Sequence, residues 1–140
     1  MNNILIVHTS WYENYISNML KVSKDILDGE FKCSVSQAPG AIELAALAKS
    51  KLNKNNYVGV LFLGIIIRGE TSHYDLITEE TFRSIGSLAE KYFDVAIINN
   101  VLCVENEKQL IERLEKNTEN NSNALIPVSY THLRAHETER

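Results

Sequence analysis

Cysteine is scarce in this chain of 140 residues, which has two, Cys33 and Cys103. Neither belongs to a CxxC pair, and both fall in short apolar stretches that read as strands. Such usage favours buried free thiols in the reducing cytoplasm. A cysteine nucleophile is disfavoured because Cys103 has no plausible histidine partner in the sequence outside the C-terminal tail.

Excess positive charge and long apolar runs are also absent. The formal net charge is −4, which gives no electrostatic footprint for nucleic acid or for an anionic membrane surface. No apolar run approaches the ~20 residues that span a bilayer. Residues 1–10 have no basic segment before their apolar stretch, so they predict a strand and not a signal peptide. We therefore expect a cytoplasmic protein with neither a nucleic-acid nor a membrane partner.

Several cofactor motifs are missing as well. The sequence has no HExxH, no CxxC and no paired histidines at helical spacing, so it predicts no metal site. It has neither GxGxxG nor GxxxxGK[ST], so it gives no support to a nucleotide-binding loop. Any phosphate must then be held locally by a few placed groups.

Four short apolar runs are present, each followed by a helical pattern. Strands are predicted at 4–7, 31–35, 58–63 and 95–98, with the fourth leading through Asn99 and Asn100 to its helix. The first two helices carry apolar faces within 12–27 and 44–52, and the others are predicted at about 72–92 and 105–116. The third helix is expected to bury Ile77, Phe82, Ile85, Leu88 and Ala89. This alternation predicts one α/β domain, a three-layer sandwich with a four-stranded parallel sheet between helices.

The tail differs from the rest of the chain. Residues 128–140 have neither helical nor strand periodicity, and 128–138 resembles the in-frame translation of a transposon-based sequencing adapter. We interpret 128–140 as a disordered artefact of that origin and 1–127 as the authentic domain, with its C-terminal helix missing. His132 and His136 are accordingly not candidate ligands.

Four predicted loops at the carboxyl ends of the strands carry the chemistry. Ligands of open α/β sheets bind at this edge. The loops hold the sole tryptophan, a Pro-Gly turn, an Arg-Gly-Glu-Thr segment and a histidine, at 10–12, 38–43, 65–74 and 99–100. Gly69 before a helix capped by Thr71 or Ser72 suits an oxyanion or phosphate, and a neutral His73 could accept a proton.

Each of these residues also has an ordinary structural interpretation. Thr71 or Ser72 can be a simple helix cap, and His73 a surface histidine. Trp11 can belong to the core, Glu43 can complement a helix dipole, and His8 is interpreted as structural.

Four motifs then resemble one family. Residues 64–75, GIIIRGETSHYD, resemble the lumazine synthase signature G-x-V-I-R-G-x-T-x-H-Y-D. Residues 39–44, PGAIEL, resemble its P-G-A-x-E-[IL], and 101–107 resembles V-L-T-x-E-N. Trp11 stands where the family has an aromatic after its first strand. The four motifs occur in order over about residues 1–120, so the resemblance outweighs the structural interpretations of four residues, and His8 stays structural. The four are Trp11, Glu43, Thr71 and His73.

The resemblance implies a flavodoxin-like fold and a cofactor-independent transferase of riboflavin biosynthesis. Its members, the 6,7-dimethyl-8-ribityllumazine synthases, condense 5-amino-6-(D-ribitylamino)uracil with 3,4-dihydroxy-2-butanone 4-phosphate. His73 would be the catalytic acid/base. The pyrimidine and its ribityl chain would contact Trp11, Ala41, Ile42, Glu43, Ile65, Ile66, Ile67 and Asn99. Glu70 (through its amide), Thr71 and Arg113 would bind the phosphate.

The same resemblance implies an assembly and leaves alternatives open. Asn99 and Arg113 would come from a neighbouring subunit, so a pentamer or a sixty-subunit shell of pentamers is expected, with riboflavin synthase as a candidate partner. One alternative is a non-catalytic flavin- or lumazine-binding scaffold of the same fold. The other is an archaeal-type riboflavin synthase, which would dismutate lumazine.

Overall fold

Four parallel strands form one sheet at the centre of the molecule. The computed structural model describes the backbone of residues 1–139 and the side chains of residues 1–128. The strands β1 (Asn2–Thr9), β2 (Phe31–Ala38), β3 (Gly59–Ile67) and β4 (Ala96–Val104) lie in the order β2-β1-β3-β4. Every residue of β3 is buried, as expected of a strand that is covered on both faces.

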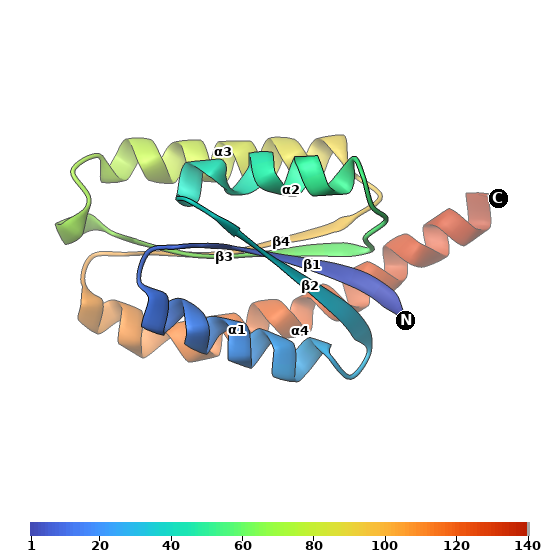
Figure 1. The fold of residues 1–140 in the computed structure, drawn as a ribbon, viewed down its shortest axis with the longest axis horizontal. Coiled ribbons are helices and arrows are strands. Elements are labelled where there is room, and N and C mark those ends of the chain that lie inside the picture. The colour runs from blue at the N-terminus through green and yellow to red at the C-terminus, as the bar shows by residue number, and fades with distance from the viewer. Residues whose placement is uncertain (140) are drawn as a thin grey trace.

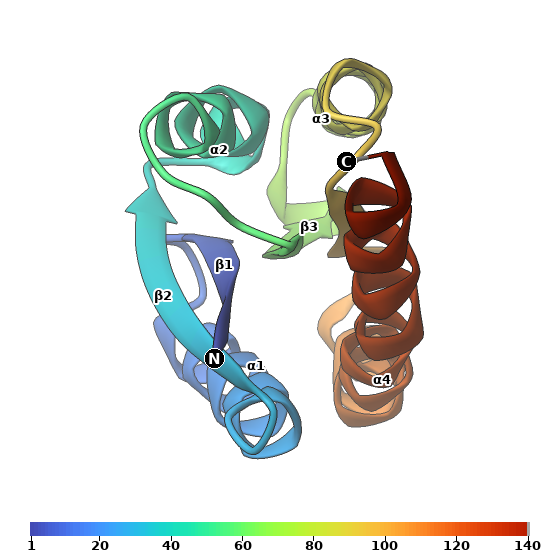
Figure 2. The same ribbon diagram turned by 90° about the vertical axis from the view of Figure 1, so that its right-hand side faces the viewer.

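Helices cover both faces of the sheet. Helices α1 (Glu13–Leu27) and α4 (Glu107–Glu139) lie on one face, and α2 (Leu44–Leu52) and α3 (Tyr74–Lys91) lie on the other (Figures 1 and 2). Alternate side chains of β1 enter the two cores, Ile4 and Ile6 on the α1/α4 side and Leu5 and Val7 on the α2/α3 side. The predicted three-layer, flavodoxin-like α/β fold is confirmed.

Polar groups fasten α4 to the sheet. The Asn100 amide on β4 donates to Thr118 Oγ1 at 3.0 Å and accepts a hydrogen bond from Asn121 at 2.7 Å. Ser122 donates to Ser23 of α1 at 3.0 Å, and Leu125 is fully buried in the same layer. Buried polar side chains with satisfied hydrogen bonds fix how two elements sit against each other. The second half of α4 is thus part of the fold.

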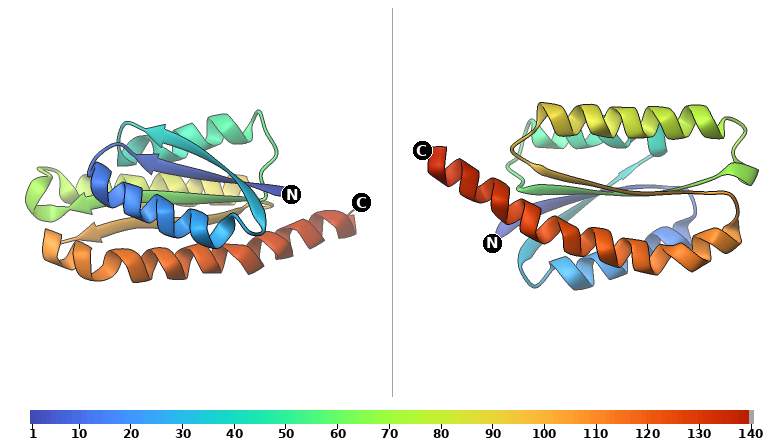
Figure 3. Two further views of the ribbon diagram at one scale, coloured as in Figure 1. Left: turned by 60° about the horizontal axis from the view of Figure 1, so that its bottom comes forward. Right: turned by 180° about the vertical axis from the view of Figure 1, so that it is seen from behind.

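Helix α4 is longer than the sequence predicted. The predicted helix ended near residue 116, but α4 continues as helical backbone through Pro127 to Glu139, and its last turns extend beyond the sheet (Figure 3). Residues 128–140 were expected to be disordered, whereas the backbone of 128–139 is helical. The side chains of 129–140 lie outside the described residues, so the interpretations of His132 and His136 stay predictions.

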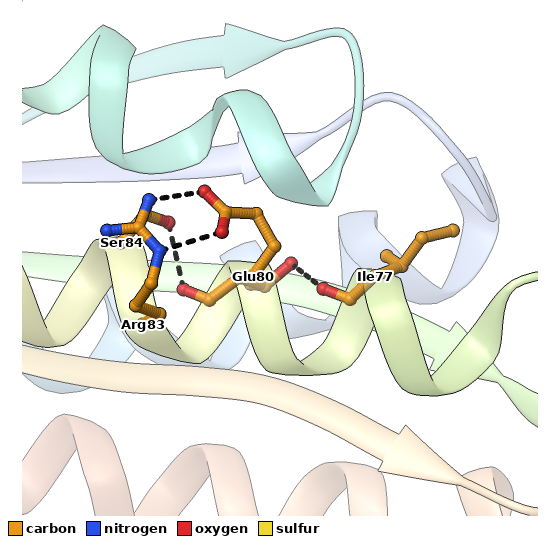
Figure 4. A network of polar contacts seen from close by, with 5 residues as sticks. Ile77, Glu80, Arg83 and Ser84 are labelled. Atoms are coloured by element: carbon orange, nitrogen blue, oxygen red, sulfur yellow. Dashed lines mark hydrogen bonds and ion pairs between the residues drawn. The ribbon is translucent and has the colours of Figure 1, made fainter.

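The buried face of α3 differs by one residue from the predicted face. Thr81, Ile85 and Leu88 are buried, whereas Phe82, predicted to be inside, is 46% exposed. The Thr81 hydroxyl is satisfied within the helix, since it donates to the Ile77 carbonyl at 2.7 Å (Figure 4). A hydroxyl that bonds back to its own helix can occupy a core position.

The exposed surface of α3 carries an ion pair beside the apolar side chains of Leu76 and Phe82. Arg83 bonds both carboxylate oxygens of Glu80, at 2.7 and 2.5 Å, and Ser84 donates to the Thr81 carbonyl at 3.1 Å (Figure 4). The ion pair is exposed and therefore contributes little to stability.

Within the described residues, no helix has the length and apolar character to cross a membrane.

Candidate active site

A cavity of about 390 Å³ opens at the carboxyl ends of β1 and β3. This volume suits a small molecule. Its walls come from the end of β1, the short helices η1 (Ala41–Glu43) and η2 (Arg68–Glu70), the end of β3 and the start of α3. The lining residues are Thr9, Trp11, Tyr12, Gly40, Ala41, Ile42, Glu43, Ile65, Ile66, Glu70, Thr71, Ser72 and Ile77.

Eight of the predicted site residues meet in this cavity. They are Trp11, Ala41, Ile42, Glu43, Ile65, Ile66, Glu70 and Thr71. Trp11 and Ile42 are 68% and 48% exposed. Large apolar side chains left open to solvent beside a cavity indicate a ligand surface and not a core. An exposed indole there provides a platform on which a flat ring can stack.

Tyr12 turns the chain from β1 into α1 through an unusual backbone conformation. Its φ and ψ of 60° and 51° lie in the left-handed region, and it is the one non-glycine residue with positive φ among those described. Such strain is typical of ligand sites. Burial raises the pKa of the Tyr12 phenol, and Glu70, whose carboxylate lies 3.5 Å from the hydroxyl, raises it further. The tyrosine thereby joins the first loop to η2.

The second loop places Glu43 over a glycine. A Cβ on Gly40 would lie 3.0 Å from Glu43 Oε1, closer than ordinary contacts, so the glycine leaves room for the carboxylate in the cavity. Ser10 holds this loop in place by donating to the Pro39 carbonyl at 2.8 Å. The Pro-Gly turn and the end of β1 therefore form one wall.

Arg68 fixes the third loop by binding other residues and not by entering the cavity. Its guanidinium pairs with Glu105 at 2.9 Å and Asp75 at 3.3 Å, and lies 4.2 Å from the centre of the Tyr74 ring. The hydrogen bond to Glu105 raises the pKa of Arg68. Because Glu105 follows β4, this contact ties the loop before α3 to the loop before α4.

His73 lies beside the cavity at the ends of β1 and β3. It lines a neighbouring hollow of about 410 Å³, and Thr71 and Ser72 line both spaces. The sequence predicted Thr71 or Ser72 as the cap of the following helix, but that is wrong, because His73 itself is the N-cap and α3 begins at Tyr74. The His73 imidazole makes no capping bond and is exposed, so it is accessible from the hollow that it shares with Thr71.

Besides His73, three predicted site residues stay outside the cavity of this chain. Ile67 is 2% exposed and packs in the α1/α4 core. Asn99 was expected to follow the fourth strand, but it lies within β4, and its Oδ1 accepts the Val101 amide at 2.8 Å. Arg113 is exposed on α4, on the other face of the sheet.

Two lining residues, Thr9 and Ile77, lie outside the four loops that the sequence indicated. Ile77 was assigned to the core face of its helix, and at the start of α3 that face also borders the cavity. Thr9 ends β1 and gives no motif signal. His8 is buried, and its Nδ1 donates to the Thr9 carbonyl at 2.8 Å, which supports its structural interpretation.

The cysteines show no sign of catalytic activation. Burial raises the pKa of Cys33 to about 12, with Asp28 adding to the shift, and burial also raises the pKa of Cys103. Reactive thiols have lowered pKa values. Among the described residues no group of three or more His, Cys, Asp or Glu side chains could hold a metal ion.

Slow thiol modification is the expected consequence. A pKa near 12 against the ordinary 9.0 leaves Cys33 with ~10³-fold less thiolate at pH 8. The reaction of the native chain with a chromogenic disulfide at pH 8 should be slow at both thiols and become fast in guanidinium chloride. A thiol that reacts as fast in the native chain as in the unfolded chain would contradict the raised pKa assigned to it.

Comparison with known proteins points to one family. The model of a family described as 6,7-dimethyl-8-ribityllumazine synthase matches residues 2–131. A relative of that name from Bartonella tribocorum is 35% identical over 120 residues, 84% of this chain and 79% of the relative. Another, from Sphingopyxis alaskensis, is 32% identical over 117 residues, 83% and 82% of the two chains. One from Prochlorococcus marinus is 44% identical over 75 residues, 54% of this chain and 47% of its own. The chain belongs to the 6,7-dimethyl-8-ribityllumazine synthase family.

Proposed function

We propose that this protein is a lumazine synthase, a transferase of riboflavin biosynthesis. It condenses 5-amino-6-(D-ribitylamino)uracil with 3,4-dihydroxy-2-butanone 4-phosphate and releases phosphate, water and 6,7-dimethyl-8-ribityllumazine. The observation that carries the proposal is the cavity in which Trp11, Glu43 and Thr71 meet beside His73, in a chain of this family.

The pyrimidine substrate fits the cavity at the ends of β1 and β3. Its flat ring stacks on the exposed indole of Trp11. Backbone groups of Ile65 and Ile66, which line the cavity, bind the polar edge of the ring, and the predicted contact of Ile67 has no support from the cavity lining. The ribityl chain lies along η1 against Ala41 and Ile42, and the Glu43 carboxylate accepts hydrogen bonds from its hydroxyls.

The sugar phosphate lies toward the start of α3. Thr71 and the amide of Glu70 bind the phosphate, with Arg113 as its cationic partner. His73, next to this seat, transfers protons during imine formation, phosphate loss and ring closure. The reaction requires that the protein position two substrates and transfer protons, so we expect catalysis without a cofactor.

A second copy of the chain completes the site in this proposal. Asn99 lies on β4, an edge strand, and Arg113 is exposed on α4, so both are available to a neighbouring molecule. The proposed assembly is a pentamer or a sixty-subunit shell in the cytoplasm, with riboflavin synthase as a candidate partner. Sedimentation of the purified chain distinguishes these sizes, and a stable monomer with full activity would contradict the shared site.

The deciding experiment is an assay with both substrates and no added cofactor. The fluorescent lumazine should form together with one phosphate for each turnover. Formation of riboflavin from added lumazine would instead identify an archaeal-type riboflavin synthase. Binding of lumazine or flavin with no turnover would identify a scaffold of the same fold.

Arg113→Ala should weaken the binding of the sugar phosphate far more than the binding of the pyrimidine. Only the former is a dianion, and a charge-assisted hydrogen bond is worth roughly 1.5–3 kcal/mol, so its KM should rise by about 10- to 150-fold. Arg83→Ala is the matched control, because Arg83 is paired with Glu80 on the surface of α3. If both variants leave the two KM values unchanged, Arg113 is a solvated helix residue.

A further inference from the structure

The hydroxyl of Thr9 is buried without a hydrogen-bond partner. Thr9 ends β1 and is 2% exposed. Its Oγ1 is almost wholly closed off from solvent, and among the described residues it has no partner. Its backbone carbonyl, in contrast, accepts the His8 Nδ1 hydrogen at 2.8 Å. Buried polar atoms are nearly always hydrogen-bonded, so this hydroxyl requires an explanation.

The position of Thr9 relates the hydroxyl to the cavity. Side chains alternate along β1, and Thr9 shares the α2/α3 face with Leu5 and Val7. The Thr9 methyl group packs 3.4 Å from the place where a Cβ on Gly64 would lie. Thr9 also lines the cavity together with Ala41, Ile66 and Ile77 of the same layer. The unpartnered hydroxyl therefore lies at the boundary between the α2/α3 core and the cavity.

A valine has the shape of threonine and would leave no unpaired oxygen at this position. The hydroxyl thus costs stability in the folded chain unless another molecule supplies its hydrogen bond. Rotation about the Cα–Cβ bond moves the hydroxyl to another staggered position, which turns the oxygen without moving the strand. We infer that the Thr9 hydroxyl hydrogen-bonds the pyrimidine substrate and helps to select it, an inference that rests on the proposed function.

Two features favour the pyrimidine over the sugar phosphate. Thr9 is two residues from the Trp11 platform, and it does not line the hollow that contains His73. A hydroxyl can both donate and accept, which suits a ring edge that carries carbonyl and N–H groups side by side. A site whose polar groups pair with a substrate rejects analogues that leave those groups unpaired.

The test compares Thr9→Val with Thr9→Ser. In Thr9→Val, KM for the pyrimidine should rise about tenfold while KM for the sugar phosphate stays the same, as the loss of one hydrogen bond predicts. Thr9→Ser keeps the hydroxyl and should retain a pyrimidine KM close to that of the parent. The melting temperature of Thr9→Val should equal or exceed that of the parent, because the valine removes an unpaired buried oxygen.

Thr81→Val is the matched control. Thr81 is also buried, but its hydroxyl is partnered, since it donates to the Ile77 carbonyl (Figure 4). This variant should lower the melting temperature and leave both KM values unchanged. If Thr9→Val behaves in the same way, or raises both KM values equally, the inference is overturned.

Calorimetry separates this inference from the proposed function. If the parent makes no lumazine, the proposed function fails, and 5-amino-6-(D-ribitylamino)uracil alone is titrated into parent and Thr9→Val. Weaker binding to the variant still supports the contact. Equal binding, or no binding to either chain, refutes it.

Discussion

His73→Ala should slow turnover by ~10²–10⁴-fold, the usual contribution of a positioned acid/base, and should leave the affinity for the pyrimidine nearly unchanged. The imidazole lines the hollow next to Thr71 and is outside the cavity assigned to the pyrimidine. The backbone of His73 anchors α3, since its carbonyl accepts the Ile77 amide at 2.9 Å. Alanine keeps this backbone bond, so the loss should be chemical and not structural.

His73→Gln is the companion variant. Glutamine can form hydrogen bonds but cannot exchange a proton near neutral pH, so it should be about as slow as alanine. Lumazine fluorescence gives kcat for both variants, and circular dichroism checks that the helical content of the chain is unchanged. Turnover equal to that of the parent in His73→Ala would remove this residue from the mechanism.

The fold class could be predicted because its signal is local. The four apolar runs are short, three of them are rich in Val, Ile and Leu, and each is followed by an apolar pattern of helical period. These features are visible without knowledge of contacts. The rule that ligands bind at the carboxyl ends of parallel strands then gave the loops that surround the cavity. The motif resemblance assigned roles within those loops.

The predicted ends of strands and helices were wrong where residues far away in the sequence determine them. Asn99 and Asn100 are typical of loops, so the fourth strand was predicted to end at residue 98, but it continues to Val104. The Asn100 side chain is acceptable inside the sheet because Thr118 and Asn121 satisfy it from α4. A sequence pattern does not contain contacts over that separation. The same contacts hold the polar segment after residue 116 in a helix.

Several features of the site could not be predicted from the sequence, because they too depend on the three-dimensional structure. The left-handed backbone of Tyr12 belongs to a residue type that rarely adopts it, so no turn signal marked it. Thr9 looked like an ordinary strand residue, and its importance depends on the absence of a partner in three dimensions. Asn99 and Arg113 were identified by resemblance, and they do not reach the cavity of their own chain.

Two truncated chains should show that the fold needs the second half of α4 and does not need the tail after it. A chain that ends at residue 116 loses Leu125, worth roughly 1.5–3 kcal/mol of burial. It also loses the partners of Asn100, and a buried amide without partners costs roughly 1–3 kcal/mol. The bonds at Ser23 and the burial of Thr118 are lost as well. Because a whole domain is stable by only about 5–15 kcal/mol, this chain should fail to fold.

A chain that ends at Val128 keeps every one of these contacts. Its melting temperature should lie within a few degrees of the full chain, because it retains Leu125 and the side chains of Thr118, Asn121 and Ser122 that make these contacts. Leu125→Ala provides the point-mutation version and should cost about 2–5 kcal/mol, as large-to-small core changes do. Ile111→Ala, at a 61% exposed position of the same helix, is its control and should be nearly neutral. Thermal unfolding by circular dichroism decides: if the chain ending at Val128 also unfolds, residues 129–140 are part of the working structure, and their interpretation as an adapter-derived tail is wrong.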